Sequence, residues 1–168
     1  MIVRGRFSTK IAFPILLAGG FAVAAVVPAA ADSMTEHTVV APEEVKWGAA
    51  PASIPPGAEA AVLYGDPSKE GLFALRLKLP PGYHIPPHFH PKPEIVTVIS
   101  GTFRLGMGEA ADQSKAEPLP AGSFFAFAPG MAHYAYADGD TVVQLNSTGP
   151  WGLTYVNPKD DPRQQASQ

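Results

Sequence analysis

The 168-residue sequence contains no cysteine. It can therefore form no disulfide bond and no zinc–thiolate site, and it has no thiol nucleophile for catalysis. Helical periodicity is also missing after the first 31 residues, and the 19 prolines and 16 glycines are spread along the chain, as is typical of turns between short strands. The length suffices for one domain with a core but is short for two. These absences favour a single all-β domain.

Basic residues are scarce in the rest of the chain. Three of the 12 lysines and arginines lie in the first 31 residues, which leaves 9 basic residues against all 15 acidic ones, a net charge of −6. An acidic surface disfavours binding to phosphate backbones and to anionic lipids. We therefore expect no nucleic-acid partner and no stable membrane association of the mature chain, and we leave a homodimer open.

The first 31 residues differ in character from the rest. Arg4, Arg6 and Lys10 precede an apolar run over residues 11–27, and Ala29 and Ala31 supply the small residues of an A-x-A cleavage site. This pattern predicts a secretory signal peptide over residues 1–31 and export to the periplasm or the medium. The alternative is an uncleaved membrane anchor, because the run approaches the roughly 17 residues of the shortest spanning helices.

The rest of the chain divides into three parts. We expect an N-terminal arm over residues 32–60, with one short strand near 45–47 and Trp47 packed on the barrel. Residues 61–157 show apolar–polar alternation of period two, with turn signals between about eight to ten short strands, which predicts a barrel or jelly roll. Residues 158–168 are polar and are predicted to form a flexible tail.

Three of the five histidines lie within seven residues of sequence. His88 and His90 are two residues apart, so on an extended strand both imidazoles point to the same face. Glu94 follows with the same parity, and His133 opens a later predicted strand. An H-x-H pair alone is a weak signal, since most strand histidines are not ligands. Together, however, these four side chains form a nitrogen and oxygen donor set that suits iron, manganese, zinc, nickel or copper better than calcium or magnesium.

The spacing around these residues resembles two motifs of the cupin superfamily. Gly82, His88, His90, Glu94 and Gly101 occupy every fixed position of the first motif. The resemblance is to small, single-domain bacterial cupins with an N-terminal signal peptide.

The second motif is matched less fully. Gly122, Gly130 and His133 fit it, whereas Ala128 stands where the family usually has proline, and Ala137 where it often has asparagine. Both departures concern a turn and a strand contact and leave the ligand positions unchanged. The resemblance implies a double-stranded β-helix, a jelly-roll-like barrel, with one divalent transition-metal ion in its mouth. The implied ligands are His88, His90, Glu94 and His133.

Other residues are candidates for a small-molecule pocket or for proton transfer. Strand parity predicts that the barrel is lined by Phe103, Leu105, Phe125, Phe127, Leu145 and Leu153. Gln144 or Asn146, on a late strand, is a further pocket candidate that could orient a bound ligand. Such a pocket would be apolar and suited to a small organic or aromatic ligand; the alternative for most of the apolar side chains is that they simply fill the core. His84, just before the ligand strand, is the candidate catalytic proton shuttle, with a surface role as the alternative.

Superfamily resemblance does not determine chemistry. The first hypothesis is a metal-dependent enzyme, such as an oxygenase acting on a small apolar or aromatic compound. The second is a non-catalytic module that binds or senses a small ligand through the metal. The third is a metal-dependent lyase or isomerase, which needs a positioned acid or base besides the ion.

Overall fold

The computed structural model describes residues 37–165 of the chain. The predicted signal peptide and its cleavage site lie outside these residues. Among the described residues, no helix has the length and apolar character needed to cross a membrane.

Two antiparallel sheets make up the domain, which confirms the predicted all-β class. The six-stranded sheet has the order β1-β2-β3-β10-β5-β8. Its strands are β1 (Gly48–Ala49), β2 (Glu59–Tyr64), β3 (Gly71–Leu79), β10 (Thr141–Gly149), β5 (Glu94–Ser100) and β8 (Phe124–Phe127). The five-stranded sheet has the order β11-β4-β9-β6-β7. Its strands are β11 (Thr154–Tyr155), β4 (His84–Phe89), β9 (His133–Ala137), β6 (Thr102–Met107) and β7 (Glu117–Pro120).

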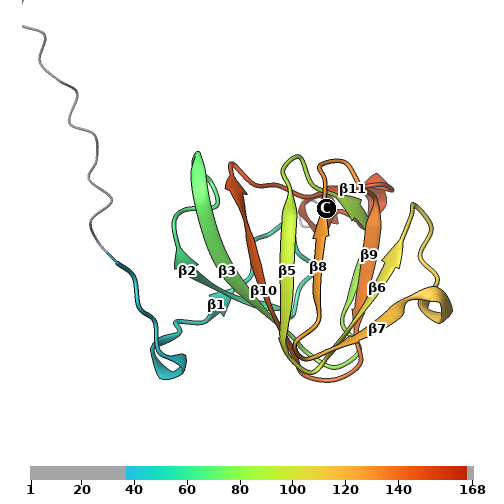
Figure 1. Ribbon diagram of the computed structural model, residues 1–168. Coiled ribbons are helices and arrows are strands. Elements are labelled where there is room, and N and C mark those ends of the chain that lie inside the picture. The colour runs from blue at the N-terminus through green and yellow to red at the C-terminus, as the bar shows by residue number, and fades with distance from the viewer. Residues whose placement is uncertain (1–36, 166–168) are drawn as a thin grey trace, which may run out of the picture. The chain divides into compact units, whose positions relative to one another are not determined.

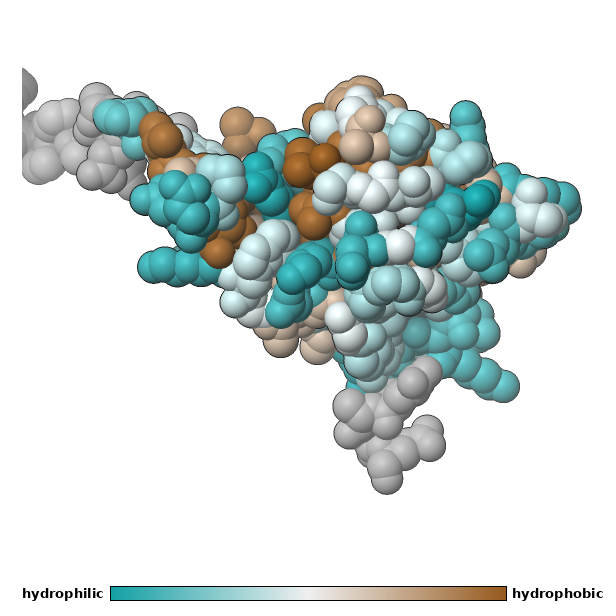
Figure 2. All heavy atoms as spheres, turned by 90° about the horizontal axis from the view of Figure 1, so that it is seen from below, coloured by the Kyte–Doolittle hydropathy of each residue, from teal (hydrophilic) through white to brown (hydrophobic). Residues whose placement is uncertain are grey.

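The sheets face each other as the two walls of a barrel, and they converge at the lower end in Figure 1. Viewed from that end, the surface carries mainly hydrophilic and weakly polar side chains, and the hydrophobic ones gather next to the N-terminal arm (Figure 2). Glu94, the first residue of β5, pairs with Phe127, the last residue of β8. Both residues lie at the opposite end of the barrel, the upper end in Figure 1. Of the two ends, this one carries the candidate ligands.

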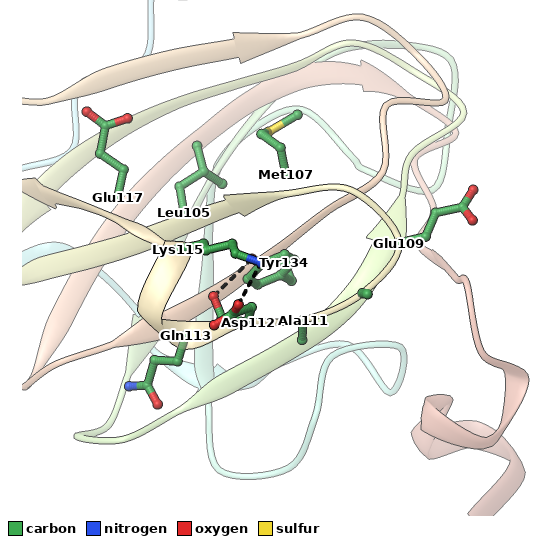
Figure 3. A pocket seen from close by; sticks show the side chains of 10 residues that line it. Leu105, Met107, Glu109, Ala111, Asp112, Gln113, Lys115, Glu117 and Tyr134 are labelled. Atoms are coloured by element: carbon green, nitrogen blue, oxygen red, sulfur yellow. Dashed lines mark hydrogen bonds and ion pairs between the residues drawn. The ribbon is translucent and has the colours of Figure 1, made fainter.

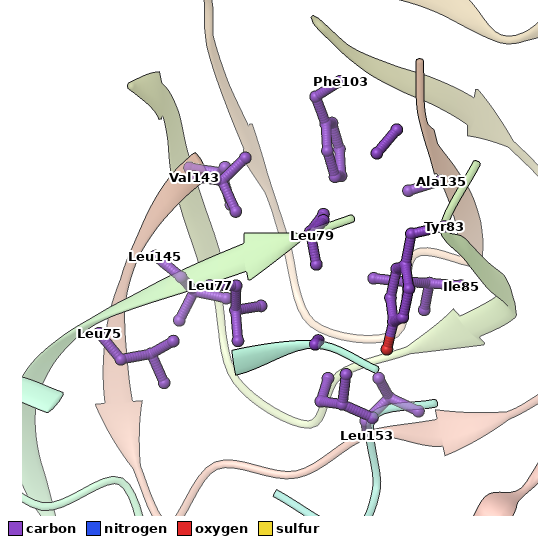
Figure 4. Close-up of a cluster of buried hydrophobic side chains, with 14 of the residues drawn as sticks. Leu75, Leu77, Leu79, Tyr83, Ile85, Phe103, Ala135, Val143, Leu145 and Leu153 are labelled. Carbon is purple, nitrogen blue, oxygen red and sulfur yellow. The ribbon is translucent and has the colours of Figure 1, made fainter. Parts of the chain in front are cut away.

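The core follows the alternation expected for half-buried strands. On β3, Phe73, Leu75, Leu77 and Leu79 are at most 6% exposed, whereas the residues between them face outward. Figure 4 shows how side chains from both sheets meet around this row. The main contributors besides β3 are Ile85, Val96, Val98, Phe103, Ala135, Val143, Leu145 and Leu153. Burial of this apolar surface is the main source of stability in a chain without disulfides.

An irregularity in β4 decides which of its side chains face the interior. Ile85 pairs with Ala135 and His88 with His133, so β4 advances three residues while β9 advances two. The additional residue forms a bulge at Pro86 and Pro87, which have no N–H to donate to the sheet. Ile85 and His88 therefore both face inward although they are an odd number of residues apart.

A tight glycine turn closes the end of β5. Gly101 has φ +77°, and a Cβ atom there would lie 2.4 Å from the carbonyl oxygen of Asp140. Only glycine fits such a position without strain. The motif glycine thus keeps β5, β6 and the β9–β10 hairpin in close contact.

The arm and the tail are attached to the barrel by hydrogen bonds. The short strand of the arm is β1, not a strand at 45–47, and a 3-10 turn, η1 (Pro42–Glu44), precedes it. The Tyr155 hydroxyl donates to the carbonyl of Ser53 at 2.8 Å, and the Tyr83 hydroxyl donates to that of Pro55.

Helical turns occur in the part of the predicted flexible tail that the structure describes. They are η3 (Pro158–Asp160) and α1 (Pro162–Gln165), and one further turn, η2 (Gln113–Lys115), precedes β7. The Arg163 guanidinium donates to the carbonyl of Leu153 at 3.1 Å. This bond links the segment after residue 157 to the barrel.

Candidate metal centre

Three imidazoles meet inside the upper end of the barrel. His88 lies on β4, His90 follows that strand directly, and His133 begins β9, where it pairs with His88 in the strand register. One ring nitrogen of each histidine lies within 4.8 Å of the other two. Each of the three residues is only 3% exposed. The sheet therefore brings together the three histidines that the sequence proposed as ligands.

A backbone carbonyl contacts the Nδ1 atom of each ring. His88 Nδ1 lies 2.7 Å from the carbonyl oxygen of Pro86, His90 Nδ1 lies 2.8 Å from that of Gly152, and His133 Nδ1 lies 2.9 Å from that of Met131. A carbonyl oxygen only accepts hydrogen bonds, so each Nδ1 carries the hydrogen and donates it. Each Nε2 atom of the neutral rings then presents its lone pair toward the cluster, which is the form that binds a metal ion.

The Glu94 carboxylate lies beside two of these nitrogens. Its Oε1 atom is 3.4 Å from His90 Nε2, and its Oε2 atom is 3.1 Å from His133 Nε2. Only the three histidines have ligand atoms that all lie within 4.8 Å of one another, and the Glu94 carboxylate lies outside that group. The carboxylate is 7% exposed and is held at the first position of β5.

The polar atoms of the cluster have the pattern expected of an ion-binding site. An ionised carboxylate and the Nε2 atoms of neutral imidazoles are all acceptors, so they cannot satisfy one another. His90 Nε2 and Glu94 Oε2 are buried without a hydrogen-bond partner among the described residues. A buried acceptor without a partner is costly, and a shared divalent cation would satisfy both. The residues present therefore fit a transition-metal ion.

Burial keeps the imidazoles neutral. It is the main cause that holds the pKa of His88 well below its ordinary value, and the neighbouring His133 and His90 lower it further. Burial also lowers the pKa of His90, against the opposing effect of Glu94. The rings of His88 and His90 consequently stay in the metal-binding form at neutral pH without the help of an ion.

A small apolar cavity adjoins the cluster, with a volume of about 30 Å³. Phe103 and Phe125 line it together with His88, Glu94 and His133, and the ring of Phe127 lies 4.9 Å from that of His133. Such a volume holds about one or two water molecules. The expected apolar lining is present, and the prediction that the cavity accommodates a small organic or aromatic ligand stays a prediction.

Three predicted pocket residues lie elsewhere. Leu153 is buried in the core. Gln144 lies on the outer face of the six-stranded sheet, where its Oε1 accepts a hydrogen bond from Arg76 Nε at 3.2 Å. Leu105 lines a separate, open groove of about 900 Å³ beside η2 (Figure 3). In that groove Lys115 forms an ion pair with Asp112 at 3.0 Å. Leu145, the neighbour of Gln144 on β10, is the residue that points inward, as strand parity predicts.

His84 does not lie at the cluster. Its register partner is Tyr136, and the two rings stack with centroids 4.3 Å apart and an interplanar angle of 6°. Both residues are on the outer face of the five-stranded sheet, because the bulge at Pro86 and Pro87 separates the face of His84 from that of His88. The predicted role of His84 as a proton shuttle at the metal is therefore wrong.

Sequence reasoning missed one residue at the cluster. The indole of Trp151 stacks on the imidazole of His90, with centroids 4.4 Å apart and an interplanar angle of 18°. The next residue, Gly152, supplies the carbonyl that accepts from His90. No spacing rule links residues that lie 62 positions apart in the chain, as His90 and Gly152 do, so only the fold shows this contact.

Comparison with known families gives a match to the model described as a cupin domain, over residues 75–148. Residues 75–148 are therefore similar to cupin domains. The matched segment holds both sheets' central strands and all four proposed ligands, and it supports membership of the cupin superfamily.

Curated relatives match the chain over part of their length. The chain is 33% identical to germin-like protein 3-1 of Oryza sativa subsp. japonica, over 60% of this chain and 43% of the relative. It is 35% identical to germin-like protein subfamily 2 member 1 of Arabidopsis thaliana, over 42% of this chain and 32% of the relative. The chain thus spans less than half the length of these relatives.

Solved structures share the cupin fold at lower identity. The polyketide cyclase RemF from Streptomyces resistomycificus superposes with a TM-score of 0.62 at 17% identity, covering 79% of this chain and 94% of RemF. KdgF from Halomonas sp. superposes with a TM-score of 0.53 at 22% identity, covering 67% of this chain and 94% of KdgF. At these identities the likeness concerns the fold alone.

The buried imidazoles make the stability of the metal-free protein depend on pH. Because burial lowers the pKa of His88 and His90 in the folded state, the unfolded chain takes up protons first as the pH falls. The free energy of unfolding should therefore decrease as the pH falls below the ordinary histidine pKa of about 6.5. Urea unfolding of chelator-treated protein, from neutral to mildly acidic pH, measures this. A His88→Gln variant should show a shallower decrease, and an equal decrease in both proteins would contradict the prediction.

Loss of one imidazole should abolish tight metal binding. Replacing residues that only orient metal ligands costs about 10–100-fold in affinity, so His88→Ala and His133→Ala should each weaken binding by at least roughly 100-fold. The control is His37→Ala, because His37 is exposed and has no proposed role. Chelator competition followed by metal analysis measures the affinity. Equal metal content in the three variants would show that the ligands are misassigned.

Proposed function

We propose that this cupin is a metal-dependent oxidoreductase of the oxygenase type that acts on a small apolar or aromatic compound. The observation that carries the proposal is the cluster of three imidazoles, each oriented by a backbone carbonyl, beside the carboxylate of Glu94. When bound there, a redox-active divalent ion would supply Lewis acidity, electron transfer and open coordination positions.

The residues around the ion have separable roles. His88, His90 and His133 would bind it through Nε2, and Glu94 would supply negative charge and an oxygen ligand. The carbonyls of Pro86, Met131 and Gly152 keep the rings in the required tautomer. Phe103 and Phe125 exclude bulk water from the space beside the cluster, which strengthens electrostatic interactions within it.

The size of the interior limits the reacting species. A cavity of about 30 Å³ has room for a ligand as small as water or dioxygen and not for an aromatic ring. An organic substrate would have to approach from the mouth of the barrel, or Phe125 and Phe127 on the edge strand β8 would have to move. The small cavity therefore favours a small co-substrate inside and the organic compound outside.

The small cavity also supports a second candidate, a module that binds the metal without turnover. A lyase or isomerase is the weaker alternative, because it needs a positioned acid or base. His84, the residue predicted for that role, faces the outside of the five-stranded sheet.

Reconstitution with single metals separates these functions. Metal-free protein is loaded with Fe(II), Mn(II), Ni(II), Cu(II) or Zn(II), and oxygen uptake and product are followed with a panel of small apolar and aromatic compounds. An oxygenase should consume oxygen with a redox-active ion and not with zinc, which has no accessible redox change. The His133→Ala variant is the control for oxygen uptake by free metal.

Turnover with zinc and no oxygen uptake would contradict the oxygenase proposal in favour of a lyase or isomerase. The absence of product with every metal would favour the binding module.

We also propose that the protein is exported, to the periplasm or the medium. The support is the positive start, the apolar run over residues 11–27 and the A-x-A site that ends at Ala31. The mature protein should start at Asp32 and be recovered outside the membrane fraction. Intact mass and N-terminal sequencing of protein from its native host measure this, and a full-length chain in the membrane fraction would contradict the proposal.

A further inference from the structure

The loop between β10 and β11 contacts one of the proposed ligands twice. The indole of Trp151 stacks on the imidazole of His90, with centroids 4.4 Å apart and planes only 18° from parallel. The carbonyl oxygen of Gly152 accepts a hydrogen bond from Nδ1 of the same ring at 2.8 Å. The stack fixes the plane of the imidazole, and the hydrogen bond fixes its rotation within that plane. Two adjacent residues therefore determine where His90 Nε2 points.

His90 differs in this respect from the other two histidines. The carbonyls that orient His88 and His133 come from Pro86 and Met131, each two residues earlier in the chain. Those two rings are thus oriented by backbone close to them in sequence. The orientation of His90 instead depends on a loop 62 residues away in sequence.

The loop itself is anchored firmly enough to hold a ring. The backbone N–H of Trp151 donates to the carbonyl of Pro67 at 2.8 Å. Gly149 packs so closely on the same β2–β3 turn that a Cβ atom would lie 2.0 Å from the carbonyl oxygen of Lys69. The indole also makes a T-shaped contact with the ring of Phe73, with centroids 6.1 Å apart and an interplanar angle of 67°. The indole is therefore fixed by the turn and the core, and not by His90 alone.

Packing alone does not account for a tryptophan at this position. Its Nε1 atom is buried and has no hydrogen-bond partner among the described residues, which is unfavourable for a donor. A phenylalanine would supply an aromatic face without that cost. The contact that the larger indole gains is the broad stack on His90, and stacked aromatic pairs contribute beyond the area that they bury.

We propose that Trp151 is a positioning residue for the metal centre, which holds the His90 ring so that Nε2 faces the ion. The inference rests on the proposed metal binding, and it adds that the β10–β11 loop tunes the affinity of the site. It also predicts that an ion bound by His90 interacts directly with the excited state of Trp151.

Fluorescence tests the contact, because the chain has only two tryptophans. A Trp47→Phe variant leaves Trp151 as the sole emitter, and Cu(II) or Ni(II) should quench it strongly while Zn(II) should not. The matched control is Trp151→Phe, in which only Trp47 emits. The Trp47 ring lies beneath Lys78 Nζ, 5.9 Å away, and its emission should change little. Unquenched Trp151 emission in protein shown by metal analysis to hold one Cu(II) would overturn the proposal.

Metal affinity tests the positioning role. Trp151→Leu should weaken Zn(II) binding about tenfold, the lower end of the effect of residues that orient ligands. Trp151→Phe keeps a stacking ring, so its affinity for Zn(II) should stay within about threefold of that of the unmodified protein. Trp47→Leu should bind Zn(II) with unchanged affinity. Equal affinity in Trp151→Leu and the unmodified protein would overturn the inference.

If Trp151→Leu does not fold, Trp151→Phe and the quenching experiment still decide. Metal binding absent from the unmodified protein would refute both the proposed function and this inference, whereas normal binding without quenching would refute the inference alone.

Discussion

The structure of the candidate centre depends on three hydrogen bonds from imidazole Nδ1 atoms to backbone carbonyls. They connect His88 to Pro86, His133 to Met131, and His90 to Gly152. Each bond specifies both the tautomer and the orientation of a ring, so the three Nε2 lone pairs converge before any ion is present. Without these bonds the rings could turn so that Nε2 forms hydrogen bonds elsewhere, and the three Nε2 atoms would no longer converge on one point.

These bonds in turn depend on irregular backbone. The carbonyl of Pro86 is available because the bulge at Pro86 and Pro87 interrupts pairing between β4 and β9. The same bulge sets the inward direction of His88 and the outward direction of His84. The two prolines therefore determine which of two nearby histidines joins the centre. A regular strand would have placed His84 and His88 on one face.

The closed interior restricts the chemistry more than the ligand set does. Both sheets contribute large apolar side chains right up to the histidines, so the remaining cavity has a volume of only about 30 Å³. The dense packing that stabilises a chain without disulfides thus also leaves little space beside the histidines. Stability and substrate access are opposing demands on the same set of side chains, with Phe103 and Phe125 at the boundary.

The sequence by itself determined the all-β class, the alternation of β3 and the set of candidate ligands. These features depend on local chemistry: a period of two places residues on one face, and the spacing of His88, His90 and Glu94 is short enough for one strand and one turn to position them. It could not place His84 correctly, because a single inserted residue reverses strand parity and bulges leave little trace beyond a pair of prolines. It could not reveal that Trp151 and Gly152 contact His90, or that the cavity is small. Those features arise only when segments distant in the chain pack together, and packing density is a property of the assembled core rather than of any one strand.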